Sequence, residues 1–452
     1  MPMAPTDRTL RDGIDAATDA SPSAPPRSAL AVIFLTVFID LLGFGIVLPV
    51  MPRQAEPYLA ALELPTALRG ATLGLLFSSF SLMQFLFSPV WGRVSDRLGR
   101  RPILILSLAG SVVFYALYGL AVTFPTEQAA AAIAVMFLSR IGAGIAGASV
   151  GTAAAVIADC TTSENRARGM ALIGIAFGAG FTLGPLIAYF GLAIFDRRPW
   201  GVGVLASLLS LVALVIAIAV FRETRNPANK AGREFFSLGR TASVLAMPAI
   251  GTCVLVYFLS IFSFANFEAT LALFTRHAFG MTDDDNFLVF AMIGVVLVIA
   301  GGGYRAIAKR WSEASLLRAG LFLMVLGLGG VGLVAWRIHG LGAPEAGQAG
   351  GPPAVTLAWF YAAAAAAVVG FACVNPSISA IISRSADPAR QGEVLGVNQS
   401  FASLGRILGP FVGSVLFTAH ASHAAPYAVA VGTLLFALSL AGRRSSSTAG
   451  SE

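Results

Sequence analysis

The chain has 452 residues, of which 56% are hydrophobic and 12% are charged, and its mean hydropathy is +0.79. A water-soluble domain carries about a quarter charged residues, so this composition excludes an ordinary soluble fold. The net charge of +7 resides largely in arginines of short loops between apolar runs. Loop charge of this kind sets membrane orientation and does not indicate nucleic-acid binding.

The first 28 residues are rich in Pro, Ser, Ala and Asp and predict a disordered cytoplasmic tail, since they lack the apolar core of a signal peptide. Apolar runs of about 20 residues follow, each long enough to cross a hydrocarbon core of about 30 Å as a helix. They do not alternate as barrel strands would. The sequence therefore predicts an all-α membrane protein with twelve transmembrane helices, at 29–50, 68–91, 102–123, 130–158, 169–194, 200–221, 244–272, 285–305, 315–336, 354–382, 393–418 and 424–442.

The longest predicted inner loop divides these spans into two six-helix, pseudo-symmetric halves. The predicted parts are an N-terminal bundle at 29–221, a central cytoplasmic linker at 222–243, a C-terminal bundle at 244–442 and a cytoplasmic tail at 443–452. With both termini inside, the inner loops hold 22 lysines and arginines and the outer loops hold six. This bias predicts a multi-pass protein of a bacterial plasma (inner) membrane with both termini in the cytoplasm.

A glycine–proline motif occurs in the same place in each predicted half. It comprises Gly180, Gly184 and Pro185 in the fifth span and Gly405, Gly409 and Pro410 in the eleventh. Small residues at four-residue spacing let membrane helices approach closely, and proline permits bending. The motif predicts helix packing, and its recurrence in both halves is typical of transporters.

Ionisable residues inside the predicted spans are few, and burying them costs several kcal/mol unless they face a partner or a cavity. Asp40 lies midway along the first span, where a buried carboxylate can bind and release a proton; a helix-packing role is the alternative. Arg140 in the fourth span cannot give up its proton but can act on a nearby carboxylate. Glu268 in the seventh span can carry a proton or contact interfacial water, and Arg406 in the eleventh can pair with a carboxylate across the cavity.

The run from Gly92 to Arg101 concentrates four arginines and an aspartate between the second and third spans. Its pattern, G-x-x-x-D-x-x-G-R-R, resembles the signature loop of the major facilitator superfamily. The stretch from Arg140 to Ala148 is similar to the fourth helix of tetracycline–proton antiporters. The stretches from Asp40 to Pro49 and from Gly180 to Ala188 resemble the first and fifth helices of such drug exporters.

This resemblance implies a twelve-helix drug–proton antiporter. It implies a cytoplasmic gate formed by Gly92, Asp96, Arg97, Gly99, Arg100 and Arg101, and a part in proton coupling for Asp40 and Arg140, to which we add Glu268. The loop between the eighth and ninth spans keeps basic residues but lacks the aspartate of the motif. Candidate substrate contacts between the halves are Phe44, Asn266, Phe267, Asn375, Gln399 and Arg406.

We therefore predict a secondary active transporter that exports an amphipathic small molecule, such as a tetracycline-like drug, in exchange for protons by alternating access. One alternative is a proton-coupled symporter or facilitator for uptake of a sugar or another metabolite. A second is a non-transporting membrane scaffold or sensor. The expected partners are the substrate, protons and the lipid bilayer, with no nucleic acid and a monomeric state.

Several patterns typical of enzymes are missing from the sequence. Neither of its two lysines follows a phosphate-binding loop, and its four histidines show no metal-ligand spacing. The three cysteines are scattered and predict neither a disulfide nor a metal site. No enzymatic activity, cofactor or metal is expected.

Overall fold

The computed structural model describes residues 27–149, 152–153, 156–157, 160, 166–224, 238–340, 354–387 and 390–449. All regular structure in these ranges is helical, which confirms the predicted fold class. The predicted N-terminal tail before residue 27 and most of the predicted central linker, 225–237, lie outside the described residues.

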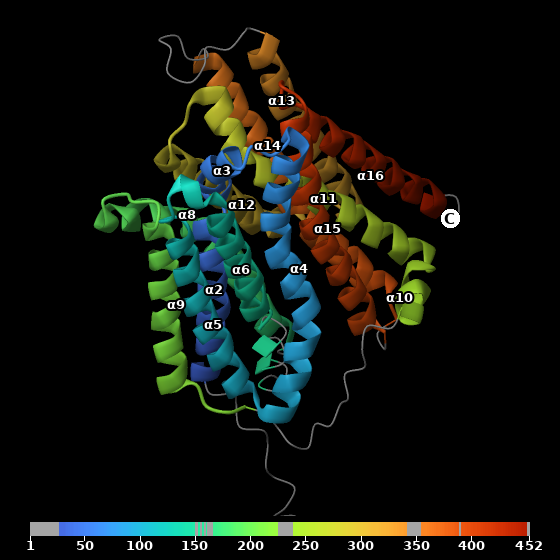
Figure 1. The fold of residues 1–452 in the computed structure, drawn as a ribbon. Coiled ribbons are helices and arrows are strands. Elements are labelled where there is room, and N and C mark those ends of the chain that lie inside the picture. Colours follow the sequence, from blue (N-terminus) through green and yellow to red (C-terminus); the bar gives the residue numbers. More distant parts are fainter. Residues whose placement is uncertain are drawn as a thin grey trace, which may run out of the picture.

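The N-terminal half is a bundle of long helices with two short connections, η1 (Thr126–Gln128) and η2 (Leu192–Phe195) (Figure 1). Its helices are α2 (Arg27–Val47), α3 (Met51–Ala61), α4 (Thr66–Leu98), α5 (Arg100–Ala121), α6 (Ala129–Gly147), α8 (Arg166–Gly191) and α9 (Gly201–Val220). Apart from α3, each of these helices overlaps one predicted span.

The C-terminal half begins with a short helix that the sequence did not predict. Its helices are α10 (Leu238–Leu245), α11 (Pro248–Phe279), α12 (Asp283–Ile307), α13 (Glu313–Gly340), α14 (Ala354–Ser385), α15 (Gln391–Ala419) and α16 (Ala425–Ala449). Helix α10 lies mainly within the predicted linker, and α16 continues beyond the predicted end of the last span at residue 442.

Ten helices in the described ranges are long and apolar enough to cross a membrane, or eleven if α2 and α3 form one bent span. The angle between α2 and α3 is 46°. The prolines of this segment suggest a loop, but Pro52 lies in the first turn of α3, where a missing N–H costs no helical hydrogen bond. Helix α8 occupies the predicted fifth span but is not among the ten, so the count of twelve stays a prediction.

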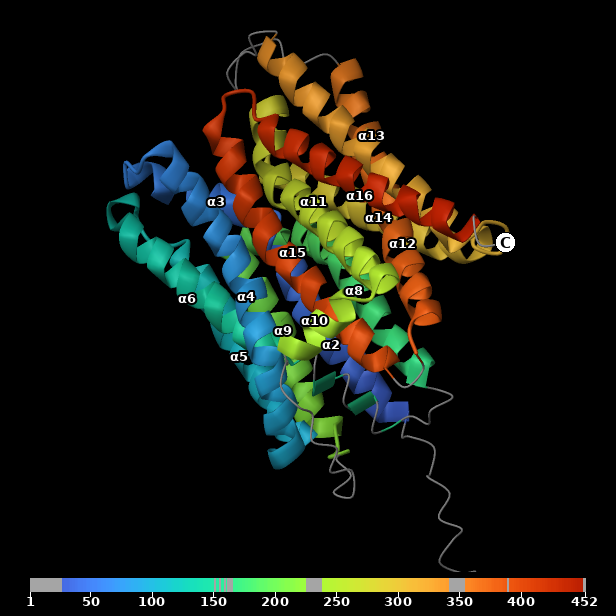
Figure 2. The same cartoon turned by 90° about the vertical axis from the view of Figure 1, so that its right-hand side faces the viewer.

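The two halves meet along two helix pairs, α4 with α15 and α8 with α12 (Figures 1 and 2). A Cβ at Gly74 of α4 would lie 2.7 Å from the Cα of Phe411, and a Cβ at Gly294 of α12 would lie 2.5 Å from the Cα of Thr182. Such distances are too short for any side chain, so glycine permits the close approach. The two bundles therefore contact each other through small residues.

Candidate functional site

The structure has two ends, which the predicted charge distribution assigns to opposite sides of the membrane. The end with α3 and the start of α12 is the predicted outside and is called the outer face below. The opposite end, with the turn between α4 and α5, is called the inner face.

Arg140 is fully buried in α6, with 1% of its surface exposed. Its guanidinium carbon lies 4.6 Å from the ring centre of Phe80 on α4 and 5.5 Å from that of Phe44 on α2. Among the described residues no carboxylate lies within 4 Å of it, and its Nε has no hydrogen-bond partner. Two aromatic rings thus hold a cation inside the N-terminal half, an arrangement in which the ring faces attract the positive charge.

Asp40 lies on α2, one helical turn before Phe44. Its backbone is described, but its side chain lies outside the described part of the structure. Helix α2 thus carries both Asp40 and Phe44, and Phe44 is one of the two aromatic contacts of Arg140. The predicted proton-coupling role of Asp40 stays a prediction.

Glu268 of α11 and Arg406 of α15 form the charged centre of the C-terminal half. The Oε1 atom of Glu268 is buried without a hydrogen-bond partner. The charge of Arg406 acts electrostatically both on Glu268 and on the hydroxyl of Tyr257, although no described carboxylate lies within ion-pair distance of its guanidinium. Tyr257 in turn donates a hydrogen bond of 3.0 Å to Oδ1 of Asn375 on α14.

The predicted substrate contacts divide into two groups. Asn375 and Gln399 are exposed, and Phe44 is half-buried against Phe80. Asn266 is completely buried, and its Nδ2 donates a 2.9 Å hydrogen bond to the carbonyl of Pro426. Phe267 is 1% exposed within the same packed core. In this conformation these two residues pack inside the C-terminal half. Their role as substrate contacts stays a prediction.

The predicted gate motif forms the turn between α4 and α5 at the inner face. Arg100 is buried, and its Nη1 lies 2.5 Å from Oδ1 of Asp96 and 2.6 Å from Oγ of Ser95. Arg97 is exposed, whereas Gly92 is buried with open space where a Cβ would stand. The ion pair of the motif thus stays within the N-terminal half.

Glu223 is a partner of the motif that sequence reasoning missed. Its carboxylate accepts hydrogen bonds from the backbone N–H groups of Arg100 (2.9 Å) and Arg101 (3.1 Å), which are the first residues of α5. Gly99 has a φ of +105°, and a Cβ there would lie 2.5 Å from Oε2 of Glu223. The backbone angle therefore favours glycine, and a Cβ at this position would also displace the carboxylate of Glu223.

The repeated glycine–proline motif lies at equivalent helix contacts in the two halves. Cβ atoms at Gly180 and Gly184 would contact the backbone of α2, the latter at 2.9 Å from Gly45. Cβ atoms at Gly405 and Gly409 would contact the backbone of α11, the latter at 2.6 Å from the carbonyl oxygen of Phe262. Pro185 and Pro410, the next residues, are buried inside α8 and α15.

Ion pairs join the two halves at the outer face. They are Arg53 with Asp283, Arg276 with Glu56, and Arg197 with Asp284. The nitrogen–oxygen distances of the first two pairs are 2.8 Å and 2.9 Å. Each pair combines one residue of the N-terminal half with one of the C-terminal half, so together they hold the outer face closed.

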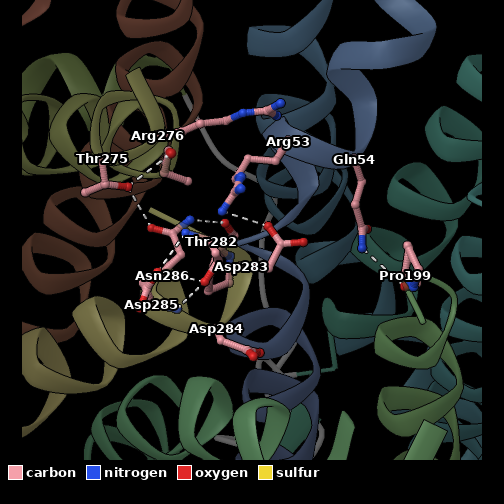
Figure 3. Close-up of polar contacts among 12 residues, drawn as sticks. Arg53, Gln54, Pro199, Thr275, Arg276, Thr282, Asp283, Asp284, Asp285 and Asn286 are labelled. Carbon is pink, nitrogen blue, oxygen red and sulfur yellow. Dashed lines mark hydrogen bonds and ion pairs between the residues drawn. The ribbon is translucent and has the colours of Figure 1, made fainter. Parts of the chain in front are cut away.

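Neutral polar contacts extend this closure (Figure 3). Nδ2 of Asn286 on α12 donates a 3.0 Å hydrogen bond to the carbonyl of Pro49 in the other half, while its Oδ1 accepts one of 2.9 Å from Thr275 on α11. Thr282 and Asp285 form the capping box that starts α12 beside Asp283. The start of α12 is thereby fixed where it faces α3.

Sequence reasoning did not predict this outer closure. Its residues are ordinary loop and helix-end charges, and the ion pairs connect positions far apart in the chain. The three aspartates that begin α12 were the available signal, since a run of like charges at a helix start needs cations nearby.

The comparisons with known proteins agree with this architecture. The family model of the Major Facilitator Superfamily matches residues 33–344 and 343–450. The chain is 30% identical over 438 residues to the major facilitator superfamily domain-containing protein 10 of Bos taurus, covering 86% of this chain and 87% of that protein. It is 28% identical over 420 residues to the class D tetracycline resistance protein of Salmonella ordonez, covering 91% and 95%.

A solved structure is similar over nearly the whole chain. It is that of the human organic anion transporter MFSD10, with 26% identity and a TM-score of 0.60, covering 92% of this chain and all of that one.

Proposed function

The chain belongs to the Major Facilitator Superfamily, and from that premise we propose that it exports an amphipathic small molecule in exchange for protons. It is a multi-pass membrane transporter, so its substrate is a small molecule and its surroundings are lipid. The similarity to tetracycline and multidrug resistance proteins supports export of drug-like molecules. We further propose an inner-membrane location with both termini in the cytoplasm, a monomeric state, and a division into two bundles at the central linker.

The buried guanidinium of Arg140 carries this proposal. A cation removed from water is costly, and among the described residues two aromatic rings and no carboxylate lie beside Arg140, so the described contacts compensate for only part of that cost. An ionised Asp40 on α2 would supply a negative charge, and protonation of Asp40 would remove it. The energy of the N-terminal half would then depend on the proton carried, as coupling between proton and conformation requires.

The closed outer face supports alternating access. A transporter of this kind needs one state closed to the outside and another open to it, and the outer ion pairs stabilise the first state. They are exposed enough to separate at modest cost, since such pairs contribute about 1 kcal/mol or less each. Proton and substrate binding would then bias the exchange between the two states.

The decisive test uses purified protein in proteoliposomes with a trapped pH indicator. Addition of a transported drug to the wild type is expected to drive proton movement opposite to drug movement. The Asp40→Asn variant is expected to lose this proton movement, because an amide cannot release a proton. Asp196→Asn is the matched control, since Asp196 is exposed at the outer face in a left-handed conformation (φ +48°) that asparagine tolerates.

The same variants should be compared for drug susceptibility of cells that express them. Full resistance and full proton movement in Asp40→Asn would reject coupling through Asp40. Proton movement in the same direction as the drug would instead support the symport alternative.

A second candidate for the substrate is an organic anion. The observation that favours it is Arg406, a cation in the C-terminal half with no described carboxylate at ion-pair distance, together with the organic anion transporter among the similar solved structures. Arg406→Gln is then expected to reduce uptake of an anionic dye into inverted vesicles about tenfold while sparing a cationic dye of similar size. Equal loss of both dyes would assign Arg406 to the structure of the bundle.

A further inference from the structure

All four histidines of the chain lie at the outer face of the C-terminal half. His277 is near the end of α11, His339 is near the end of α13, and His420 and His423 lie in the connection between α15 and α16. The ring centres of His277 and His423 are 4.9 Å apart, and those of His339 and His420 are 6.2 Å apart. The fold thus gathers side chains that the sequence scatters over nearly 150 positions.

His277 also faces the other half of the molecule. Its Nε2 lies 4.0 Å from Oε1 of Glu56 on α3. Glu56 is already the partner of Arg276, the residue that precedes His277. The histidine cluster therefore touches one of the ion pairs that close the outer face.

The charged groups around His277 divide between the two halves. Burial is the largest influence against a positive charge on His277, and His423 and Arg276 of its own half disfavour that charge further, whereas Glu56 of the other half favours it. The remaining histidines, His339 and His420, act on His423. When the halves separate at the outer face, His423 and Arg276 stay with His277 and the carboxylate of Glu56 is lost. The contact with Glu56 therefore favours a positive charge on His277 in the closed arrangement.

His423 lies beside His277 but has no carboxylate partner among the described residues. Its ring stacks on Phe417 with centres 4.2 Å apart, and its Nδ1 lies 2.7 Å from the carbonyl oxygen of the same residue, so that Nδ1 donates the hydrogen bond. Burial lowers the pKa of His423 below its usual value, the hydrogen bond to Phe417 acts in the opposite direction, and the neighbouring histidines lower the pKa further. His277 has a carboxylate oxygen 4.0 Å from its Nε2, and its side chain is 44% exposed, so we place the added proton on His277 in mild acid.

We propose that His277 and Glu56 form a sensor of extracytoplasmic acidity that holds the outer face closed when His277 is protonated. The unperturbed histidine titrates between about pH 5 and pH 8, the range in which this device would act. The proposal rests on the alternating access of the proposed function, and it adds a site that responds to outside pH and takes no part in carrying the transported proton.

The test measures the closure itself, without transport. The three cysteines, Cys160, Cys253 and Cys373, are replaced by alanine, and spin labels are attached at Ala60→Cys on α3 and Arg337→Cys on α13, both exposed at the outer face. Distance distributions are recorded for the full chain in nanodiscs between about pH 8 and pH 5. An Asp40→Asn background without substrate removes the contribution of the proposed coupling carboxylate.

The closed population is expected to rise about threefold on acidification, because an exposed ion pair stabilises a conformation only modestly. His277→Gln and Glu56→Gln should each abolish the rise, whereas His420→Gln, a matched outer histidine without a contact to the other half, should keep it. A full rise in either of the first two variants, or a closed population that falls in acid, would overturn the proposal. This experiment measures a distance between spin labels and not transport. Failure of drug–proton exchange in the proteoliposome experiment would therefore reject the proposed function without deciding whether His277 and Glu56 respond to pH.

Discussion

Arg140 shows at the scale of one residue how a costly side chain points to function. It is buried in α6 over two aromatic rings, and no described carboxylate pairs with it. A desolvated cation–π contact is worth about 2 kcal/mol, whereas the burial of an ion costs several kcal/mol. When Asp40 is protonated, Arg140 is therefore expected to lower the stability of the N-terminal half.

Replacement of Arg140 by methionine tests this expectation. Methionine fills a similar long, unbranched volume without the charge, so at a pH that protonates Asp40 the Arg140→Met variant should unfold at the same temperature as the wild type or a higher one. Its proton-coupled transport should fall at least about tenfold, because the conformation would no longer respond to Asp40. Thermal unfolding in detergent and transport in proteoliposomes measure the two effects on one preparation.

Leu138→Met provides the control, since Leu138 is an exposed side chain on the same helix. It should change neither quantity. If Arg140→Met lost stability and transport together, Arg140 would have a structural role and the coupling proposal would lose its support.

Single residues differ in how far the sequence could predict them. Arg140, Glu268 and Arg406 stand out because charges are rare inside apolar runs. Glu223 could not be found in this way, because it lies just after the end of α9, where charges are common, and meets the α5 N-terminus across 123 positions of chain. Asn266 looked like a cavity residue, but it is buried, and its Nδ2 donates to a carbonyl that only the folded bundle supplies.

At the scale of elements, the turn between α4 and α5 depends on Gly99 and Glu223. Gly99→Ala should cost about 1 to 3 kcal/mol, since alanine meets both a left-handed backbone and the carboxylate of Glu223. Glu223→Ala should cost about 1 kcal/mol through the uncapped start of α5. Thermal unfolding measures both changes. Gly301→Ala in α12, where a Cβ meets open space, should leave stability unchanged or slightly raised.

The repeated motif predicts matched effects in the two halves. Gly184→Ala and Gly409→Ala each introduce a Cβ within 3 Å of another helix backbone, so each should destabilise its bundle by about 1 to 3 kcal/mol. Gly432→Ala in α16 meets no atom within 4 Å and is the control. The melting temperatures of the three variants, each compared with that of the wild type, measure these changes in stability. A control-like result at either position would mean that the helices separate without cost and that the motif does not hold them.

The long helices could be predicted from the sequence because hydrophobic length decides them. Each long helix overlaps a predicted span, and most boundaries agree to within several residues, but α6 ends at Gly147 where the predicted span runs on to residue 158. Helix α3 could not be predicted, since its Pro52 and Pro57 are typical of a loop and its contacts come from helices distant in the sequence, including α6 and α11. The length of an apolar run thus predicts the membrane-spanning helices. It does not predict an element such as α3, where tertiary packing overrides the helix propensity of the residues.

At the scale of the whole molecule, the internal repeat predicts two halves but not how they sit against each other. That arrangement depends on contacts between distant residues, such as Arg276 with Glu56 at a separation of 220 positions. No pattern in one half specifies its partner in the other. The closed outer face is therefore a property that only the folded structure reveals.

A charge swap tests whether the outer ion pairs determine this arrangement. Asp283→Arg alone places two cations together and should reduce the closed population about tenfold, as judged by the distance between labels at Ala60 and Arg337. Adding Arg53→Asp restores an ion pair of opposite polarity and should recover most of that loss. The difference between the single and double variants should shrink as salt is raised, because the pair is partly exposed and the screening length is about 10 Å at 0.1 M salt.

Glu313→Arg is the matched control, because Glu313 pairs with Arg384 inside the C-terminal half. Its reversal disturbs an ion pair without touching the contact between halves, so the distance at the outer face should stay unchanged. If the double swap failed to recover the closed population while Glu313→Arg had no effect, the close packing of α4 against α15 would account for the closure. The charges at the outer face would then serve only to orient the start of α12.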